Sequence, residues 1–351
     1  MAENTEQQLQ DKVQQAITDK QPLKIIGGNS KHFYGRPLSG RECSSMNHQG
    51  IINYQATELV ITAKAGTRLT ELEQVLAKHN QILAFEPPRF NSSSTIGGCI
   101  AAGLSGPARP FSGAARDFVL GFRIINGKAE VVKFGGEVIK NVAGYDLSRL
   151  LTGSLGTLGL LLEVSLKTMP RPAHTLSLRF EMDETQAINN INQYINQALP
   201  ITASCIRDQQ LLLRLSGAKT AVEAAHKKFS GETVDNKIWL SLQNQTDSFF
   251  KQKNNLWRLS LPPTTPPVSL KGSQLIEWNG AQRWLYSDEP ANDIYKLAHS
   301  LGGHACLFKP EKPAQQVFQP LDENLMALQR TVKQAMDPQG IFNPGRMYKE
   351  L

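Results

Sequence analysis

The chain has 351 residues, more than one hydrophobic core ordinarily organises, so two domains are expected. Hydrophobic residues make up 40% and charged residues 20% of the sequence, which excludes a disordered or fibrous protein. The net charge of +7 comes from Lys and Arg residues scattered along the chain without a basic block, so a dedicated nucleic-acid-binding protein is not expected.

The cysteines and the N-terminus bear on cofactors and location. Four cysteines lie far apart and form no C-x-x-C pair, so we expect reduced thiols and no metal or iron–sulfur site in this chain: Cys43, Cys99, Cys205 and Cys306. The first twenty residues lack the basic and apolar regions of a signal peptide, and no run of about 18 apolar residues follows. We therefore expect a cytoplasmic protein without a transmembrane segment.

Two helices are predicted in the first part of the chain. Thr5 and Gln8 form a capping box ahead of apolar residues at helical spacing, which predicts a helix of about three turns. Thr70 and Glu73 are expected to cap a second helix, which ends near Asn80.

Strands are predicted between and after these helices, with a hairpin turn at Asn126-Gly127. They cover residues 23–28, 58–66, 117–127, 129–136 and a buried run at 159–169. The prolines at 170 and 172 mark a boundary, because residues before proline are driven out of helical conformation.

The second part of the chain is predicted to alternate strands and helices around an antiparallel α+β sheet. Its strands are expected at 174–182, 201–217 and 237–242, its helices near 184–198, 218–229 and 290–301, and a proline-rich loop at 261–270. A last helix is predicted at 319–336, where Asp337-Pro338 ends it.

The distribution of glycine in the sequence bears on which nucleotide-binding motifs are possible. Of the 27 glycines, 13 fall between Gly97 and Gly159. No two glycines stand two positions apart, so the fingerprint G-x-G-x-x-G of the Rossmann fold cannot occur, and the P-loop pattern is also missing. A standard dinucleotide fold is therefore excluded.

Two glycine-rich segments can nevertheless hold a ligand. In "IIGGNSKHFYG" a strand leads into Gly27 and Gly28, whose conformational freedom lets N–H groups converge on an anion, with Ser30 and Lys31 adding a hydroxyl and a cation. A plain surface turn is the alternative. In "TIGGCIAAGLSG" the missing side chains leave bare backbone, with amides free for a flat ligand, although packing against another backbone would explain it equally well.

The order of these segments resembles the family of FAD-binding oxidoreductases typified by vanillyl-alcohol oxidase and p-cresol methylhydroxylase, which bind FAD without a Rossmann unit. More narrowly, it resembles the FAD-binding subunits of glycolate oxidase, also called glycolate dehydrogenase. The resemblance covers most of residues 23–172 and the last fifteen residues, and is loose over 175–315. It is carried by "KIIGGNSKHFYGR", "ELVITAKAGTRLTELEQVLA", "LAFEPPRF", "TIGGCIAAGLSGPARPFSGAARDFVLGFRIING", "VVKFGGEVIKNVAGYDLSRLLTGSLGTLGLLLEVSLKTMPRP" and "DPQGIFNPGRM".

The resemblance implies where FAD would lie. The loop that matches the diphosphate-binding turn comprises Gly27, Gly28, Asn29, Ser30 and Lys31. The segment that would run along the flavin contributes Thr95, Ile96, Gly97, Gly98, Ala101, Ala102, Gly103 and Gly106, and Pro87 precedes it. Further cofactor-binding residues are implied at Arg116 and Asp117, at Gly156 and Leu160 near the adenine half, and at Asn343 and Arg346 in the returning C-terminus.

The resemblance also bears on chemistry. Relatives that bind flavin covalently through this loop carry a histidine directly after the two glycines, and here that position is Asn29, so non-covalent FAD is expected. The histidine-rich signature of relatives that oxidise 2-hydroxy acids is reduced to "LGGHACLF" around His304, which we interpret as a core or surface histidine. No catalytic residue is assigned.

The expected fold is α+β: a two-subdomain FAD-binding domain of the vanillyl-alcohol oxidase type at 1–172, split near residue 56, an inserted antiparallel cap at 173–315, and a C-terminal helix and tail at 316–351. The expected function is that of the FAD-binding subunit in a complex that oxidises glycolate to glyoxylate. A sibling flavoprotein would abstract the hydride, and an iron–sulfur subunit would carry electrons to the membrane, whose inner face the complex could contact. Two alternatives remain, a self-sufficient FAD-dependent 2-hydroxyacid dehydrogenase and a structural subunit that binds flavin weakly.

Overall fold

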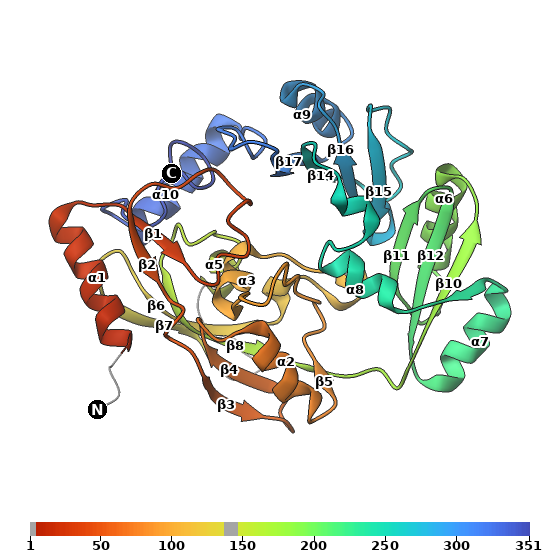
Figure 1. Ribbon diagram of the computed structural model, residues 1–351, viewed down its shortest axis with the longest axis horizontal. Helices are drawn as coiled ribbons and strands as arrows, with labels where there is room; N and C mark the ends of the chain where they lie inside the picture. The colour runs from red at the N-terminus through yellow and green to blue at the C-terminus, as the bar shows by residue number, and fades with distance from the viewer. Residues whose placement is uncertain (1–4, 137–146) are drawn as a thin grey trace. The chain divides into compact units, whose positions relative to one another are not determined.

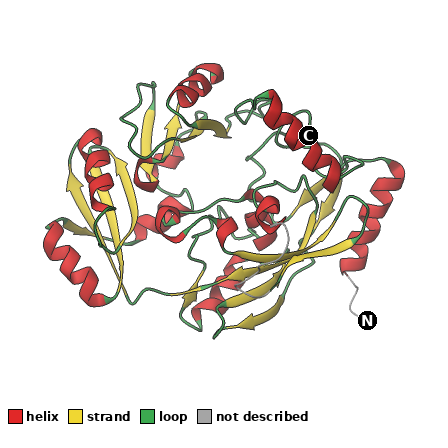
Figure 2. Ribbon diagram, turned by 180° about the vertical axis from the view of Figure 1, so that it is seen from behind, coloured by secondary structure: helices red, strands yellow, loops and turns green. Residues whose placement is uncertain are grey.

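The computed structural model describes residues 5–136 and 147–351. The chain divides into two compact units, of which unit 1 comprises Met1–Leu104, Ala114–Pro170 and Pro320–Leu351, and unit 2 comprises Ser105–Gly113 and Arg171–Gln319. Both units combine helices with antiparallel sheet, so the predicted α+β class is confirmed (Figure 2). Among the described residues, no helix has both the length and the apolar character needed to cross a bilayer.

Unit 1 is built on a five-stranded sheet in which every neighbouring pair is antiparallel. Its order is β3 (Ile51–Gln55), β4 (Val60–Lys64), β8 (Leu160–Lys167), β6 (Val119–Ile125) and β7 (Val131–Gly135). Two helices, α2 (Leu69–Ala77) and α3 (Ile96–Ala102), bury their apolar faces in one core with β4, β6 and β8 (Figure 1). The sheet core therefore fixes α3, which carries much of the predicted flavin segment.

A smaller sheet in unit 1 carries the first glycine pair. Strands β1 (Leu23–Ile26) and β2 (Arg41–Ser44) pair in parallel, and the C-terminal tail lies along β1 through a parallel bridge between Leu23 and Phe342. Helix α1 (Thr5–Asp19) packs in the same cluster as β1 and the tail. The remaining elements of the unit are the short strands β5 (Gln81–Ile82) and β9 (Met169–Pro170), the helix α5 (Leu147–Leu151), the 3-10 helix η1 (Ala115–Asp117) and the final helix α10 (Glu323–Met336).

Unit 2 is an eight-stranded antiparallel sheet. Its order is β13 (Glu232–Val234), β10 (His174–Glu181), β12 (Gln210–Gly217), β11 (Ile201–Arg207), β15 (Ser273–Glu277), β16 (Gln282–Tyr286), β14 (Leu256–Ser260) and β17 (His304–Lys309). Helices α6 (Glu184–Tyr194) and α7 (Lys219–Phe229) form one core with β10 to β12, and α9 (Ala291–Ser300) forms another with β14, β16 and β17. The short α4 (Arg109–Ser112) and α8 (Lys237–Gln243) complete it, with the 3-10 helices η2 (Ser248–Lys251) and η3 (Trp278–Gly280).

Three local predictions are wrong. Residues 237–242 form helix α8 rather than a strand, because the buried side chains Trp239 and Leu242 follow helical spacing and the Trp239 indole donates a hydrogen bond to Ser177. Thr70 lies inside α2, whose N-cap is Arg68 without a side-chain bond. Thr5 is the first described residue of α1, and its hydroxyl lies 3.0 Å from Nδ1 of His48 instead of capping the helix.

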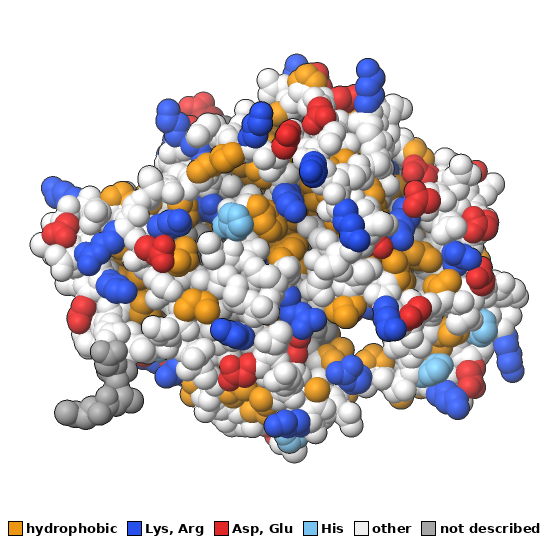
Figure 3. All heavy atoms as spheres, viewed as in Figure 1, with side chains coloured by type: hydrophobic (Ala, Val, Ile, Leu, Met, Phe, Trp, Pro, Cys, Tyr) orange, Lys and Arg blue, Asp and Glu red, His pale blue; other side chains and the backbone are white. Residues whose placement is uncertain are grey.

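Positively charged side chains are spread over the face of the molecule drawn in Figure 3, in agreement with the absence of a basic block in the sequence. Lys and Arg side chains lie singly among acidic and neutral surface, as their spacing along the chain suggests.

Candidate cofactor site

The loop after β1 presents a row of unused backbone donors. In the described part of the chain, no acceptor lies within hydrogen-bond distance of the N–H groups of residues 27 to 31. Asn29 has a φ of 52°, in the left-handed region, and its side chain is exposed. Successive N–H groups in a turn of mixed handedness form a concavity that binds anions. The predicted cradle therefore has the backbone chemistry that a diphosphate requires.

Lys31 adds a partly buried positive charge to this loop. Its ammonium group donates hydrogen bonds to the hydroxyls of Ser94 (2.7 Å) and Ser30 (3.2 Å) and lies 5.5 Å from the ring centroid of Phe90. Burial lowers the pKa of Lys31. Over residues 5–136 and 147–351, no carboxylate lies within ion-pair distance of this amine, so an anion bound in the loop would supply its counter-charge.

Residues 93–95 lie directly against the two glycines. A Cβ on Gly28 would lie 1.5 Å from the Ser93 carbonyl oxygen, and a Cβ on Gly27 would lie 2.5 Å from Oγ1 of Thr95. The Ser93 hydroxyl also donates a hydrogen bond to the Gly28 carbonyl. Both positions thus require glycine for a close approach, which joins the first loop to the start of α3.

Helix α3 replaces the free backbone strip that we expected between residues 95 and 106. Thr95 is its N-cap, and its hydroxyl accepts a hydrogen bond from the Gly98 N–H (3.2 Å). The N–H groups of Ile96 and Gly97 donate to carbonyls in the turn before α2. The prediction that these amides are free for ring atoms is therefore wrong, because tertiary hydrogen bonds already occupy them.

The two glycines of α3 have different surroundings. A Cβ on Gly97 would lie 2.7 Å from Cβ and 2.8 Å from the carbonyl oxygen of Ala65, so this glycine serves packing. A Cβ on Gly98 would meet only the Thr95 hydroxyl, at 3.2 Å. Ile96 and Ala102 are buried with Gly97, and Ala101 packs partly against the core. Of the two glycines of α3, Gly98 is therefore the one whose missing side chain leaves room for a ligand.

The C-terminal end of α3 is held by the turn at 152–157. Gly103 caps the helix with a φ of 63°, and a Cβ there would lie 2.8 Å from Cα of Gly153. The Gly153 and Leu155 N–H groups donate to the carbonyls of Ile100 (3.0 Å) and Ala101 (2.8 Å). The C-terminal end of α3 and the turn at 152–157, about fifty residues apart in the sequence, are thus held together by hydrogen bonds.

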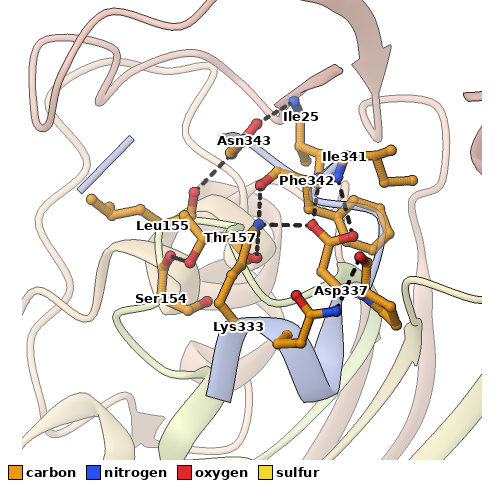
Figure 4. Close-up of polar contacts among 11 residues, drawn as sticks. Ile25, Ser154, Leu155, Thr157, Lys333, Asp337, Ile341, Phe342 and Asn343 are labelled. Atoms are coloured by element: carbon orange, nitrogen blue, oxygen red, sulfur yellow. Dashed lines mark hydrogen bonds and ion pairs between the residues drawn. The ribbon is translucent and has the colours of Figure 1, made fainter. Parts of the chain in front are cut away.

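The tail joins this turn to the first loop, as Figure 4 shows for Asn343. The Asn343 side chain accepts a hydrogen bond from the Ile25 N–H (2.7 Å) and donates to the Leu155 carbonyl (2.7 Å). Its amide also closes on Gly156, where a Cβ would lie 2.8 Å from Nδ2 of Asn343. Arg346 donates to several carbonyls of the loop at 32–36. Both tail residues therefore bind protein backbone beside the cradle.

Three predicted site residues are buried or hydrogen-bonded within the protein itself. Pro87 is buried, and Leu160 is buried in β8 within the cluster that contains α1. Gly106 belongs to unit 2, where its carbonyl accepts a hydrogen bond from the Trp278 indole (3.0 Å). In unit 2 the Arg109 guanidinium also lies 4.3 Å from the Trp278 ring centroid, so the chain between 105 and 113 is anchored there.

The remaining candidates lie at the surface. Arg116 and Asp117 lie in η1 with exposed side chains, and the Asp117 carboxylate accepts a hydrogen bond from the Ala114 N–H (2.8 Å). His32 is exposed and its ring contacts the Asn29 carbonyl, while His304 is exposed at the start of β17. Partial desolvation of the imidazole and the charges of Arg258 and Arg109 lower the pKa of His304. Residues 137–146 of the resembling segment at 131–172 lie outside the described residues.

Sequence reasoning missed four residues that shape the site. Ser93 and Ser94 contact the first loop, and Lys333 and Asp337 hold the tail. A signal existed for each pair: the serines belong to the run "NSSST" directly before the glycines of α3, and the other two are an oppositely charged i,i+4 pair at a predicted helix end.

The comparisons with known proteins identify an FAD-binding domain and the family of the chain. A family model described as an FAD binding domain matches residues 2–135. The chain is 48% identical over 345 residues to the glycolate oxidase subunit GlcE of Escherichia coli (strain K12), covering 98% of each chain. It is also 30% identical over 170 residues to the glycolate oxidase subunit GlcD of Bacillus subtilis, which is 48% of this chain and 36% of that one.

The fold has solved counterparts. A crystal structure of p-cresol methylhydroxylase with substrate bound superposes with a TM-score of 0.74 at 14% sequence identity, covering 97% of this chain and 87% of that one. A structure of alkyldihydroxyacetonephosphate synthase gives a TM-score of 0.67 at 16% identity, covering 96% and 75%. The near full-length identity to the bacterial subunit decides the relationship: this chain belongs to the family of the glycolate oxidase subunit GlcE, and is an FAD-dependent oxidoreductase with the fold of p-cresol methylhydroxylase.

Proposed function

We propose that this chain is the FAD-binding subunit of a multi-subunit glycolate oxidase that converts glycolate to glyoxylate. The observation that carries the proposal is the loop at 27–31, where unused N–H groups and the partly buried Lys31 amine lie beside the open face of Gly98. The names of the relatives supply the substrate and the complex. In this proposal residues 1–172 and 316–351 hold FAD, and residues 173–315 form the cap.

The described residues suit FAD as a ligand. The N–H groups of residues 27 to 31 would bind the diphosphate, and Lys31 would neutralise part of its charge. A flat ring can approach the backbone at Gly98, where a Cβ would meet only one protein atom. FAD supplies a two-electron acceptor for the alcohol carbon of a 2-hydroxy acid. Asn29 offers no nucleophile for a covalent bond, so the protein would hold FAD through these contacts alone.

The proposal assigns one-electron transfer to another chain. The four cysteines are free thiols buried at separate places in the fold, and burial raises the pKa of each. Isolated thiols of this kind cannot provide the thiolate set of an iron–sulfur cluster. We therefore place the cluster in a partner subunit and hydride abstraction in a sibling flavoprotein, with the assembled complex at the inner face of the cytoplasmic membrane.

An anaerobic titration tests this proposal. The purified chain is loaded with FAD, glycolate is added, and the visible flavin spectrum is followed; the experiment is then repeated with the assembled complex. We expect the isolated chain to bind FAD without being reduced by glycolate and the complex to be reduced. Reduction of the isolated chain would instead favour a self-sufficient dehydrogenase, and failure to bind FAD would refute the proposal.

A further inference from the structure

The C-terminal tail is anchored by a buried ion pair at the end of α10. The Lys333 ammonium donates hydrogen bonds to the Asp337 carboxylate (2.7 Å) and to the carbonyls of Thr157 (2.7 Å) and Phe342 (2.8 Å) (Figure 4). The same carboxylate accepts hydrogen bonds from the N–H groups of Ile341 (3.1 Å) and Phe342 (2.8 Å). The pair therefore fixes the direction in which the chain leaves the helix and ties it to the turn at 152–157.

From this anchor the tail reaches the back of the first loop. The Arg346 guanidinium donates to the carbonyls of Tyr34 (2.6 Å), His32 (3.1 Å) and Arg36, and the Arg36 N–H donates to the Arg346 carbonyl (2.9 Å). A Cβ on Gly35 would lie 2.8 Å from Nε of Arg346, so the loop closes tightly around the guanidinium. Because both terminal nitrogens of the guanidinium bind loop carbonyls, this side chain holds the loop in place.

Charge distinguishes this arginine from the lysine of the anchor. Lys333 is neutralised by Asp337, whereas in the described ranges Arg346 and Lys31 have no carboxylate within ion-pair distance. Burial lowers the pKa of Arg346 to about 10. Lys31 in the loop and Arg346 in the tail are thus two cations without a carboxylate within ion-pair distance among the described residues, and the negative charge of a bound diphosphate would favour both.

We propose that Arg346 is a positioning residue for FAD: by binding the carbonyls at 32–36 it holds in place the loop whose N–H groups at 27–31 would bind the diphosphate, so cofactor binding and tail docking stabilise each other. This inference rests on the proposed function, since it concerns how the same site retains FAD. It assigns to the tail a role in retaining the diphosphate half rather than a contact with the flavin ring. By reciprocity, the ligand must protect the tail as much as the tail favours the ligand.

Four proteins and three ligands test the proposal. The dissociation constants of FAD, ADP and riboflavin are measured for the wild-type chain, Arg346→Met, Arg346→Lys and Arg283→Met. Arg283 is the matched control, because it is likewise a buried arginine, burial lowers its pKa to about 10, and it donates to carbonyls of Gly280, Pro266 and Thr265 in unit 2. ADP carries the diphosphate without the flavin, and riboflavin carries the ring without the diphosphate.

We expect Arg346→Met to weaken FAD and ADP by the same factor, about 10- to 100-fold for lost interactions of a charged group, and to leave riboflavin unchanged. Arg346→Lys should recover part of the loss, because it restores the charge without the planar donors. Arg283→Met should lose thermal stability but keep the affinity for ADP. Unchanged ADP affinity in Arg346→Met would overturn the proposal, as would an equal loss in Arg283→Met.

Hydrogen exchange in the wild-type chain gives a second, independent result if Arg346→Met does not fold. Saturating ADP should slow exchange in the tail peptide at 341–348, and unchanged exchange there would also overturn the proposal. The proposed function fails separately, because it requires only that the wild-type chain binds FAD.

Discussion

Replacing Gly98 with valine should block the binding of the flavin ring while leaving the stability of the protein almost unchanged. In the free protein the new Cβ meets only the Thr95 hydroxyl at 3.2 Å, which can shift by a few tenths of an ångström. Valine is somewhat more favourable than glycine in a helix, so the free energy of unfolding should stay within about 1 kcal/mol of the wild type. The branched side chain nevertheless fills the open face of the helix, and a ring displaced from that face should lose at least about 100-fold in affinity, or about 2.7 kcal/mol.

The assay compares FAD titrations with urea unfolding for Gly98→Val and the matched variant Gly97→Ala. A Cβ on Gly97 would lie 2.7 Å from that of Ala65 in the core, so this smaller change should cost about 1–3 kcal/mol of stability. We thus expect Gly98→Val to lose FAD binding and keep its stability, and Gly97→Ala to lose stability. If Gly98→Val bound FAD as tightly as the wild type, the placement of the ring would be refuted.

Four further predictions concern the Lys31 charge, the Lys333–Asp337 pair and the way in which the flavin is held. Lys31→Met should weaken FAD, and wild-type affinity should fall as pH rises through the lowered pKa of Lys31, since the anion binds the ammonium form; a titration series over pH shows whether the variant loses this dependence. The stability of the FAD-free protein should change in the opposite sense, rising with pH between that lowered pKa and the ordinary value of 10.5, where the unfolded chain binds a proton that the folded chain lacks. Asp337→Asn should cost about 3–5 kcal/mol in urea unfolding because it leaves Lys333 buried without its partner, and adding Lys333→Met should restore part of the loss. Acid precipitation of the loaded protein should release all flavin into the supernatant, and flavin that remained with the pellet would contradict non-covalent binding.

The fold was predictable where periodicity and turn chemistry agree with tertiary structure. The structure confirms the strands predicted at the positions of β1, β4, β6, β7, β8 and β10 to β12. It also confirms the helices predicted at the positions of α1, α2, α6, α7, α9 and α10. The strands β14 to β17 went unrecognised, although their side chains form much of the core of unit 2. Helix α8 was mistaken for a strand because "KIWLSL" is apolar in composition, and only the buried pair Trp239 and Leu242 reveals its helical spacing.

The sequence suggested where a cofactor site would lie, and one expectation about its backbone chemistry was wrong. The two glycines after β1 and the cation of Lys31 could be inferred from the sequence, because their usefulness depends on local backbone geometry. The state of the amides at 96–98 could not, because their acceptors lie in the turn before α2 and in the Thr95 side chain. The role of Gly97 is equally non-local, since only packing against Ala65 distinguishes it from Gly98.

Exchange of the backbone amides in the first loop shows directly whether these N–H groups bind the diphosphate of FAD. Amides without acceptors exchange rapidly in the FAD-free protein, and a diphosphate that accepts their hydrogen bonds protects them. We expect saturating FAD to slow exchange in the peptide covering residues 26–33 and ADP to reproduce this protection. Unchanged exchange in this peptide, in a protein shown to be saturated with FAD, would mean that the diphosphate lies elsewhere.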